Sequence, residues 1–213
     1  KAAYDARVRL PWHSVRPNRP AFEANIGFEP LDLERIDIAA TCAACAIDHS
    51  VPPVPDSPGG STAGYHRWQS FLQHGLSGYA RDRNDAAKDW PHGVSRLSPY
   101  LHHGHVSPFR IAREAAAAGG EGSVKFLDEL LIWRELAFNF CFFTDDPGSL
   151  SALPTWAQAT LAEHAQDTRP RIIDSETLSR SGSGDEVWDL AQTSLRNHGE
   201  LHNNLRMTWA KAI

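Results

Sequence analysis

Apolar residues in the second half of the chain recur at helical spacing, and almost no segment alternates as a strand does. Ser61 is positioned to cap a predicted helix, and the apolar face of that helix carries Tyr65, Trp68, Phe71, Leu72 and Leu76. A second helix is predicted to begin at Ser107, with Pro108 in its first turn, and to end at Gly119. The pattern therefore predicts an all-α fold.

The longest apolar pattern begins at Ser123 and continues through Phe140. It is apolar around most of its circumference, which predicts a central, buried helix. Asp145–Gly148 is expected to end this unit. Three further helices are predicted, at Thr155–Gln166, at Asp185–Asn197 with Gly199 as a stop, and from His202 onward.

Residues 1–60 have a different character. Prolines without periodicity predict an irregular segment, one helix is predicted over Leu31–Ile47, and Val51–Gly60 is a Pro- and Gly-rich loop. We therefore expect an N-terminal segment and linker at 1–60, and a helical domain at 61–213. Since the chain begins with Lys1 and stops within a predicted helix, it is interpreted as a fragment.

Composition is that of an ordinary globular protein, with 41% hydrophobic and 22% charged residues. The net charge of -5 argues against non-specific coating of nucleic acid but allows a local basic groove. No membrane-spanning run or signal peptide is visible. Three cysteines indicate a reducing compartment, and Cys42 and Cys45 are interpreted as small core residues of an Ala-rich helix.

The segment from Ser95 to Pro108 is the first candidate site. Ser95 and Ser98 supply hydroxyls close to a helix start, where free backbone N–H groups suit an anion such as phosphate. Clusters of Ser and Pro are more often plain turns. His102, His103 and His105 lack the spacing and the extra ligands of a metal site, so no metal is predicted.

Charged residues on the predicted central helix need partners. Glu129 and Trp133 share one face at a spacing of four, and Arg134 is rotated by about 100°. These residues either form a buried Arg–Glu pair or line a pocket for a planar ligand with polar edges. On the last helix, Asn203 and Arg206 share a face that is either solvated or directed into the same pocket.

Four motifs occur in one order: Tyr79–Asp85, Ser95–Pro108, Phe126–Cys141 and Leu201–Lys211. Together they resemble the helical FAD-binding domain of the DNA photolyase/cryptochrome family, over about residues 59–213. Details such as Arg83-Asn84-Asp85 resemble the class II cyclobutane pyrimidine dimer photolyases. The resemblance implies a FAD-binding domain that is truncated at its C-terminus and lacks the family's N-terminal α/β antenna domain.

The resemblance also implies roles for individual residues. Tyr79 would contact FAD, and its phosphates would be held by Ser95, Leu97 and Ser98. The flavin would be contacted by Arg134, Asn203 and Arg206. Glu129 would hydrogen-bond a base of the lesion and Trp133 would pack on it, while Arg83 would meet DNA at a phosphate. Trp188 and Trp209 fall where the electron-transfer tryptophans of class II lie.

The implied activity is light-driven repair of pyrimidine dimers in UV-damaged DNA by electron transfer from reduced FAD. The partner would be damaged DNA, with no membrane and no obligate protein partner, in the cytoplasm or, in a prokaryote, at the nucleoid. Two alternatives remain. One is a cryptochrome-like flavin photoreceptor without repair activity, and the other is a helical scaffold that binds no flavin in this truncated form.

Overall fold

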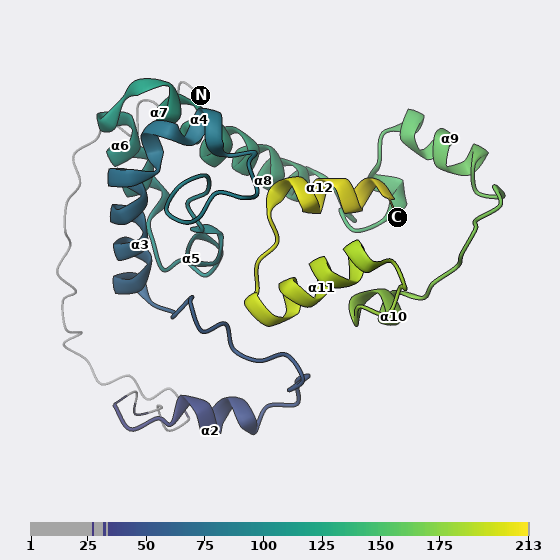
Figure 1. Ribbon diagram of the computed structural model, residues 1–213, viewed down its shortest axis with the longest axis horizontal. Helices are drawn as coiled ribbons and strands as arrows, with labels where there is room; N and C mark the ends of the chain where they lie inside the picture. The colour runs from purple at the N-terminus through teal and green to yellow at the C-terminus, as the bar shows by residue number, and fades with distance from the viewer. Residues whose placement is uncertain (1–26, 28–31, 33, 213) are drawn as a thin grey trace.

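The computed structural model describes residues 27, 32 and 34–212, and all regular structure in this part of the chain is helical (Figure 1). The first half contains α2 (Ile38–Ala43), α3 (Ser61–His74), η1 (Leu76–Gly78), α4 (Tyr79–Asp82), α5 (Ser98–His102), α6 (Pro108–Ala118) and α7 (Gly120–Leu127). The second half contains η2 (Asp128–Trp133), α8 (Arg134–Phe143), η3 (Leu150–Ala152), α9 (Thr155–Glu163), α10 (Ser175–Ser179), α11 (Glu186–His198) and α12 (Asn203–Ala212). The predicted helical fold is confirmed.

The hydrophobic core lies where α3, α4, α6 and α7 meet. The ring of Phe126 on α7 stacks on Trp68 of α3 at a centroid distance of 5.5 Å. The ring of Tyr79 meets the same phenylalanine edge-on, also at 5.5 Å. Aromatic pairs at such distances add to the stability that burial supplies. Trp68 and Phe71 are both buried, as the spacing of apolar residues along α3 predicts.

Two close approaches fix α7 against its neighbours. A Cβ at Gly122 would lie 1.9 Å from the carbonyl oxygen of Leu76, so only glycine allows α7 to pass this near to η1. Ser123, which is buried, donates its hydroxyl to the carbonyl of Ala115 on α6. These contacts place the start of α7 firmly in the core.

Helix boundaries follow their capping residues. Ser107 accepts a hydrogen bond from the backbone N–H of Arg110 and begins α6, which ends before Gly119 as predicted. Asp185 caps α11 in the same way, and Gly199 ends it in the left-handed conformation. At α3 the cap is Gly60, and Ser61 is the first helical residue rather than the predicted cap.

The prediction of one central, buried helix from Ser123 is wrong. The segment consists of α7, a π-helical turn (η2) and α8, and α8 contains no buried residue. Figure 1 shows α8 running away from the core toward α9 and α12. Phe142 is 81% exposed, and several other apolar side chains of α8 are exposed as well. Periodicity revealed an apolar helix but not what covers it.

The N-terminal predictions are confirmed only in part. The helix expected over Leu31–Ile47 is the shorter α2, whereas residues 28–31 and 33 lie outside the described part of the chain. Cys42 and Cys45 are exposed, which corrects their interpretation as core residues. They lie on a short helix with no buried residue. Among the described residues, no helix is long and apolar enough to cross a membrane.

Candidate functional site

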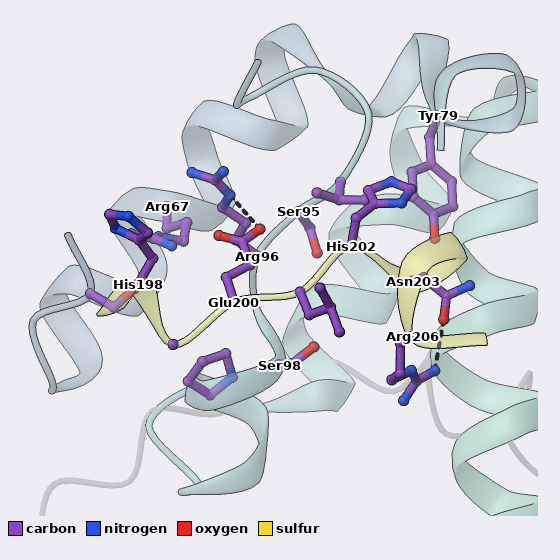
Figure 2. A pocket seen from close by; sticks show the side chains of 15 residues that line it. Arg67, Tyr79, Ser95, Arg96, Ser98, His198, Glu200, His202, Asn203 and Arg206 are labelled. Carbon is purple, nitrogen blue, oxygen red and sulfur yellow. Dashed lines mark hydrogen bonds and ion pairs between the residues drawn. The ribbon is translucent and has the colours of Figure 1, made fainter. Parts of the chain in front are cut away.

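A pocket of about 350 Å³ lies between the core and the C-terminal helices, a volume within the range of small-molecule sites. Its lining comes from segments far apart in the sequence: Ser57, Arg67, Tyr79, Val94, Ser95, Arg96, Ser98, Pro99 and the residues from His198 to Asn203, together with Arg206. Figure 2 shows these side chains around the pocket. Five residues that the sequence predicted to contact a cofactor are thus brought together: Tyr79, Ser95, Ser98, Asn203 and Arg206.

Tyr79 forms the wall between the pocket and the core. It begins α4, and its ring is nearly buried against Phe71 and Phe126. Burial raises the pKa of the Tyr79 hydroxyl, and the neighbouring Arg83 opposes this effect only in part. The hydroxyl therefore stays protonated near neutral pH and is able to donate a hydrogen bond.

The hydroxyl-rich segment contains α5, a five-residue helix that begins at Ser98 and that the sequence did not predict. Ser95 and Ser98 line the pocket, whereas the side chain of Leu97 is 1% exposed and belongs to the core. Arg96 has a positive φ of 52°, a conformation that costs energy for residues other than glycine. Its guanidinium forms an ion pair with Glu200 at 2.8 Å, so this turn is tied to the C-terminal half.

The pocket is rich in hydrogen-bond donors. Arg206 donates to Asn203 Oδ1 at 2.7 Å, and the guanidinium of Arg67 lies over the rings of Trp90 and Tyr100 at 5.6 and 5.5 Å. Glu200 is the only carboxylate among the lining residues, and Arg96 already holds it. Arginine and hydroxyl groups in this number favour an anionic ligand with many acceptor atoms.

Other lining residues had no predicted role, and three of them carry charged or imidazole side chains: Arg67, Arg96 and His202. Arg67 lies on α3 beside the apolar face, where a charged residue looks like part of a solvated surface. His202 precedes α12, and its Nε2 is buried without a hydrogen-bond partner in the described structure. For His202 the sequence offered one signal: it directly precedes Asn203, a predicted FAD contact in the same motif.

Glu129 lies in a second cluster, on η2. Its Oε1 atom is 2.8 Å from Nη2 of Arg83 and 2.8 Å from Nζ of Lys125. Lys125 also pairs with Asp128 at 2.9 Å. No role was predicted for Lys125 from the sequence, although it lies one turn before Glu129. The pairing joins two residues that the sequence assigned to lesion and DNA contacts, Glu129 and Arg83.

The pocket and the cluster around Glu129 meet at Tyr79. The guanidinium of Arg83 lies 5.9 Å from the centroid of the Tyr79 ring, while its other contact is Glu129. A further link runs from α12, where the side-chain amide of Asn204 donates to the backbone carbonyl of Asn84 at 2.7 Å. The pocket and the Glu129 cluster therefore share one wall.

Trp133 ends the π-helical turn and is 59% exposed. Hydrogen bonds in a π-helix connect residues five apart, so the α-helical spacing that placed Glu129 and Trp133 on one face does not apply here. π-helical turns within α-helices are frequent at functional sites. The exposed ring is available as a stacking surface for a planar partner.

The structure does not bring Arg134 to the pocket. Its guanidinium lies over the ring of Phe138 at 5.0 Å on α8, and Arg134 is absent from the pocket lining. Trp188 lies half-buried on α11 and donates from Nε1 to the carbonyl of Leu178 at 3.2 Å. Trp209 lies on α12, but its side chain is outside the described residues. Within the described residues, no group of three or more His, Cys, Asp or Glu side chains is placed to hold a metal.

Comparison with known proteins gives consistent results. No protein-family model matches the chain. The chain is 41% identical over 146 residues to the deoxyribodipyrimidine photo-lyase of Oryza sativa subsp. japonica, which covers 67% of this chain and 28% of the relative. It is 37% identical over 155 residues to the protein of that name from Methanothermobacter thermautotrophicus, with 73% of this chain and 34% of the relative covered.

A solved structure shares the fold. It is a bacterial class III photolyase from Agrobacterium tumefaciens, with a TM-score of 0.58 and 24% identity, over 74% of this chain and 33% of that protein. The chain spans about a third of the length of the relatives that it matches. The order of motifs, the helical fold and these similarities agree, and the chain belongs to the photolyase family.

Proposed function

We propose that this chain forms the phosphate-side part of a FAD site and the lesion-facing cluster of a light-driven DNA-repair enzyme. One observation carries the proposal. Tyr79, Ser95, Ser98, Asn203 and Arg206 lie in three segments that span more than a hundred residues, yet they line one donor-rich pocket. A dinucleotide with two phosphates offers the acceptor atoms that such a pocket lacks.

The residues present fit this cofactor. The buried Nε2 of His202, which has no hydrogen-bond partner in the described structure, supports this fit, because a ligand acceptor would pair with it. The hydroxyls of Ser95 and Ser98 and the guanidinium of Arg206 would hold the phosphates, and Asn203 would orient Arg206 through their 2.7 Å hydrogen bond. Leu97 would contribute only through its backbone, because its side chain is in the core.

FAD, held by these residues, would supply light-driven electron transfer to and from a pyrimidine dimer, the chemistry that opens its cyclobutane ring. This chain would position the lesion. The exposed face of Trp133 would pack on the unstacked bases, and Glu129 would form a hydrogen bond with one of them. These roles rest on the family resemblance and on the adjacency of the two clusters.

The Arg83–Glu129 ion pair suggests how DNA would engage the site. A DNA phosphate competes with Glu129 for the guanidinium of Arg83, because both are anions that accept charge-assisted hydrogen bonds. Lys125, which lies 2.8 Å from Glu129, would still compensate its charge if Arg83 turned to a phosphate. Binding of DNA would thus free one side of Glu129 for the lesion.

The first experiment is a titration of the 213-residue chain with FAD, followed by flavin absorbance and fluorescence. Binding is expected, and Ser98→Ala combined with Arg206→Met is expected to weaken it. Ser149→Ala, at a partly exposed residue outside the pocket lining, is the matched control. Failure of the unaltered chain to bind FAD would favour a helical scaffold without flavin.

The second experiment tests repair. The 146-residue part of this chain that aligns with the Oryza sativa relative replaces the matching segment of that protein, and dimer loss from UV-irradiated DNA is followed under blue light. Repair is expected, and Glu129→Ala should lower its yield while flavin stays bound. A chimera that holds flavin, binds damaged DNA and repairs nothing would favour a flavin photoreceptor instead.

A further inference from the structure

His202 precedes α12, and its imidazole has a defined tautomer. The backbone N–H of Asn204 donates to Nδ1 of His202 at 3.2 Å. A nitrogen that accepts a hydrogen bond carries no proton, so in the neutral ring the proton resides on Nε2. His202 therefore presents an N–H donor from its far nitrogen.

That donor is buried and unused. Nε2 of His202 has no hydrogen-bond partner in the described part of the chain, and the ring lines the pocket. In Figure 2 the ring lies between the labelled side chains of Ser95 and Tyr79. Buried polar atoms are almost always paired in folded proteins, and an exception calls for a missing partner.

In the described structure no acceptor of the pocket forms a hydrogen bond with Nε2. The side chains of Arg67 and Arg206 offer only donors, whereas the hydroxyls of Ser95 and Ser98 are able to donate or accept. The carboxylate of Glu200 is held by Arg96 at 2.8 Å. An acceptor brought by the ligand would satisfy the imidazole and the arginines at once, and phosphate oxygens have this chemistry.

We propose that His202 anchors the phosphate part of the flavin nucleotide by donating a hydrogen bond from Nε2 to a phosphate oxygen. This inference rests on the proposed FAD site. It assigns a new binding residue and predicts that the contribution of His202 depends on the phosphates rather than on the flavin ring. A comparison of FAD with riboflavin, which has the ring but no phosphate, isolates that dependence.

Affinity of the 213-residue chain for FAD and for riboflavin is measured by quenching of flavin fluorescence. His202→Phe keeps a planar ring without the donor, and we expect its Kd for FAD to rise about 10- to 100-fold. The Kd for riboflavin should change less than about twofold. His202→Gln places an amide N–H near the position of Nε2 and should restore much of the FAD affinity.

His66→Phe is the matched control, because His66 is an exposed histidine on α3 that does not line the pocket. It should leave both affinities nearly unchanged. Circular dichroism checks that each variant folds. Nitrogen-15 NMR of the imidazole in the unaltered chain should report a proton on Nε2 and a shift of that signal when FAD is added.

Equal losses of FAD and riboflavin affinity in His202→Phe would show that His202 packs rather than donates, and would overturn the inference. Unchanged FAD affinity, or a proton on Nδ1 in the NMR spectrum, would overturn it as well. In these cases the FAD site itself would stand. If the unaltered chain binds no FAD, the proposed function fails and the inference fails with it.

Discussion

Residues 61–130 and residues 134–212 are both helical, but they are stabilised in different ways. The first region has a continuous aromatic and aliphatic core around Trp68, Phe71 and Phe126. In the second region, Ser183 is the one buried residue among those described, and large apolar side chains on α8 and α9 are exposed. Helical periodicity alone therefore does not indicate which helices contribute to a core. The candidate site lies where the two regions meet.

The largest difference in stability between the two regions is expected from replacement of a core tryptophan. Trp68→Ala removes a fully buried ring that stacks on Phe126 and donates from its indole to Glu114 at 2.6 Å. We expect the free energy of unfolding to fall by about 3–5 kcal/mol, measured by urea denaturation with circular dichroism. Phe142→Ala in α8 should change it by less than about 0.5 kcal/mol. Similar losses for the two would contradict the division into regions.

A smaller loss is expected where α7 touches η1. Gly122→Ala places a methyl group 1.9 Å from the carbonyl of Leu76, and backbone has to move. The strain should exceed the gain in helix propensity and lower the free energy of unfolding by about 1–3 kcal/mol. Gly148→Ala is the control, because its nearest neighbour is a side-chain oxygen of Asp146 at 3.8 Å. A stabilised Gly122→Ala variant would disprove this close approach.

The ion pair between the two regions should have a modest effect. Arg96→Met breaks the contact with Glu200, and both side chains are 39% exposed. Because solvent screens such pairs, we expect a loss of only about 0.2–1 kcal/mol. A double-mutant cycle with Glu200→Gln measures the coupling, which should shrink at high salt. Coupling that is insensitive to salt would show that the contact is not electrostatic.

The smallest effect concerns acid stability in the second region. Partial burial raises the pKa of Asp189, but hydrogen bonds from Ser183 and Gly184 lower it by more, so the pKa lies below its ordinary value. Such a carboxylate stabilises the folded chain above its unfolded pKa of about 3.9, and this stability is lost as pH falls through the folded pKa.

Asp189→Asn should therefore flatten the decline of the melting temperature below about pH 4. Glu163→Gln, a change at an exposed residue at the end of α9, serves as the control. An unaltered acid profile for Asp189→Asn would mean that these hydrogen bonds do not persist in solution.

Much of the fold was predictable from local signals. Ser107 and Gly119 bound α6, and Asp185 and Gly199 bound α11, because caps and left-handed glycines act through neighbouring backbone. The π-helical turn before Arg134 was not predictable, since apolar spacing does not reveal whether hydrogen bonds join residues four or five apart. The exposure of α8 was not predictable for a different reason: an apolar helix face does not show which other element packs on it.

The site was predictable where motifs carried it. The family resemblance placed Ser95, Ser98, Asn203 and Arg206 in one site, and the structure brings them to one pocket. It also placed Arg134 there, which the structure does not support. Arg67 and His202 could not be assigned, because their role depends on which groups face them across the pocket and not on their neighbours in sequence.

The position of Tyr79 limits which substitutions the protein is able to accept there. Tyr79 lines the pocket, and its ring also lies next to the guanidinium of Arg83, which forms an ion pair with Glu129. A substitution at this position alters both sites simultaneously, so neither can be tuned through it alone. Variation at Tyr79 should therefore be accompanied by compensating changes in both clusters, whereas Ser98 and Lys125 are free to vary independently of each other.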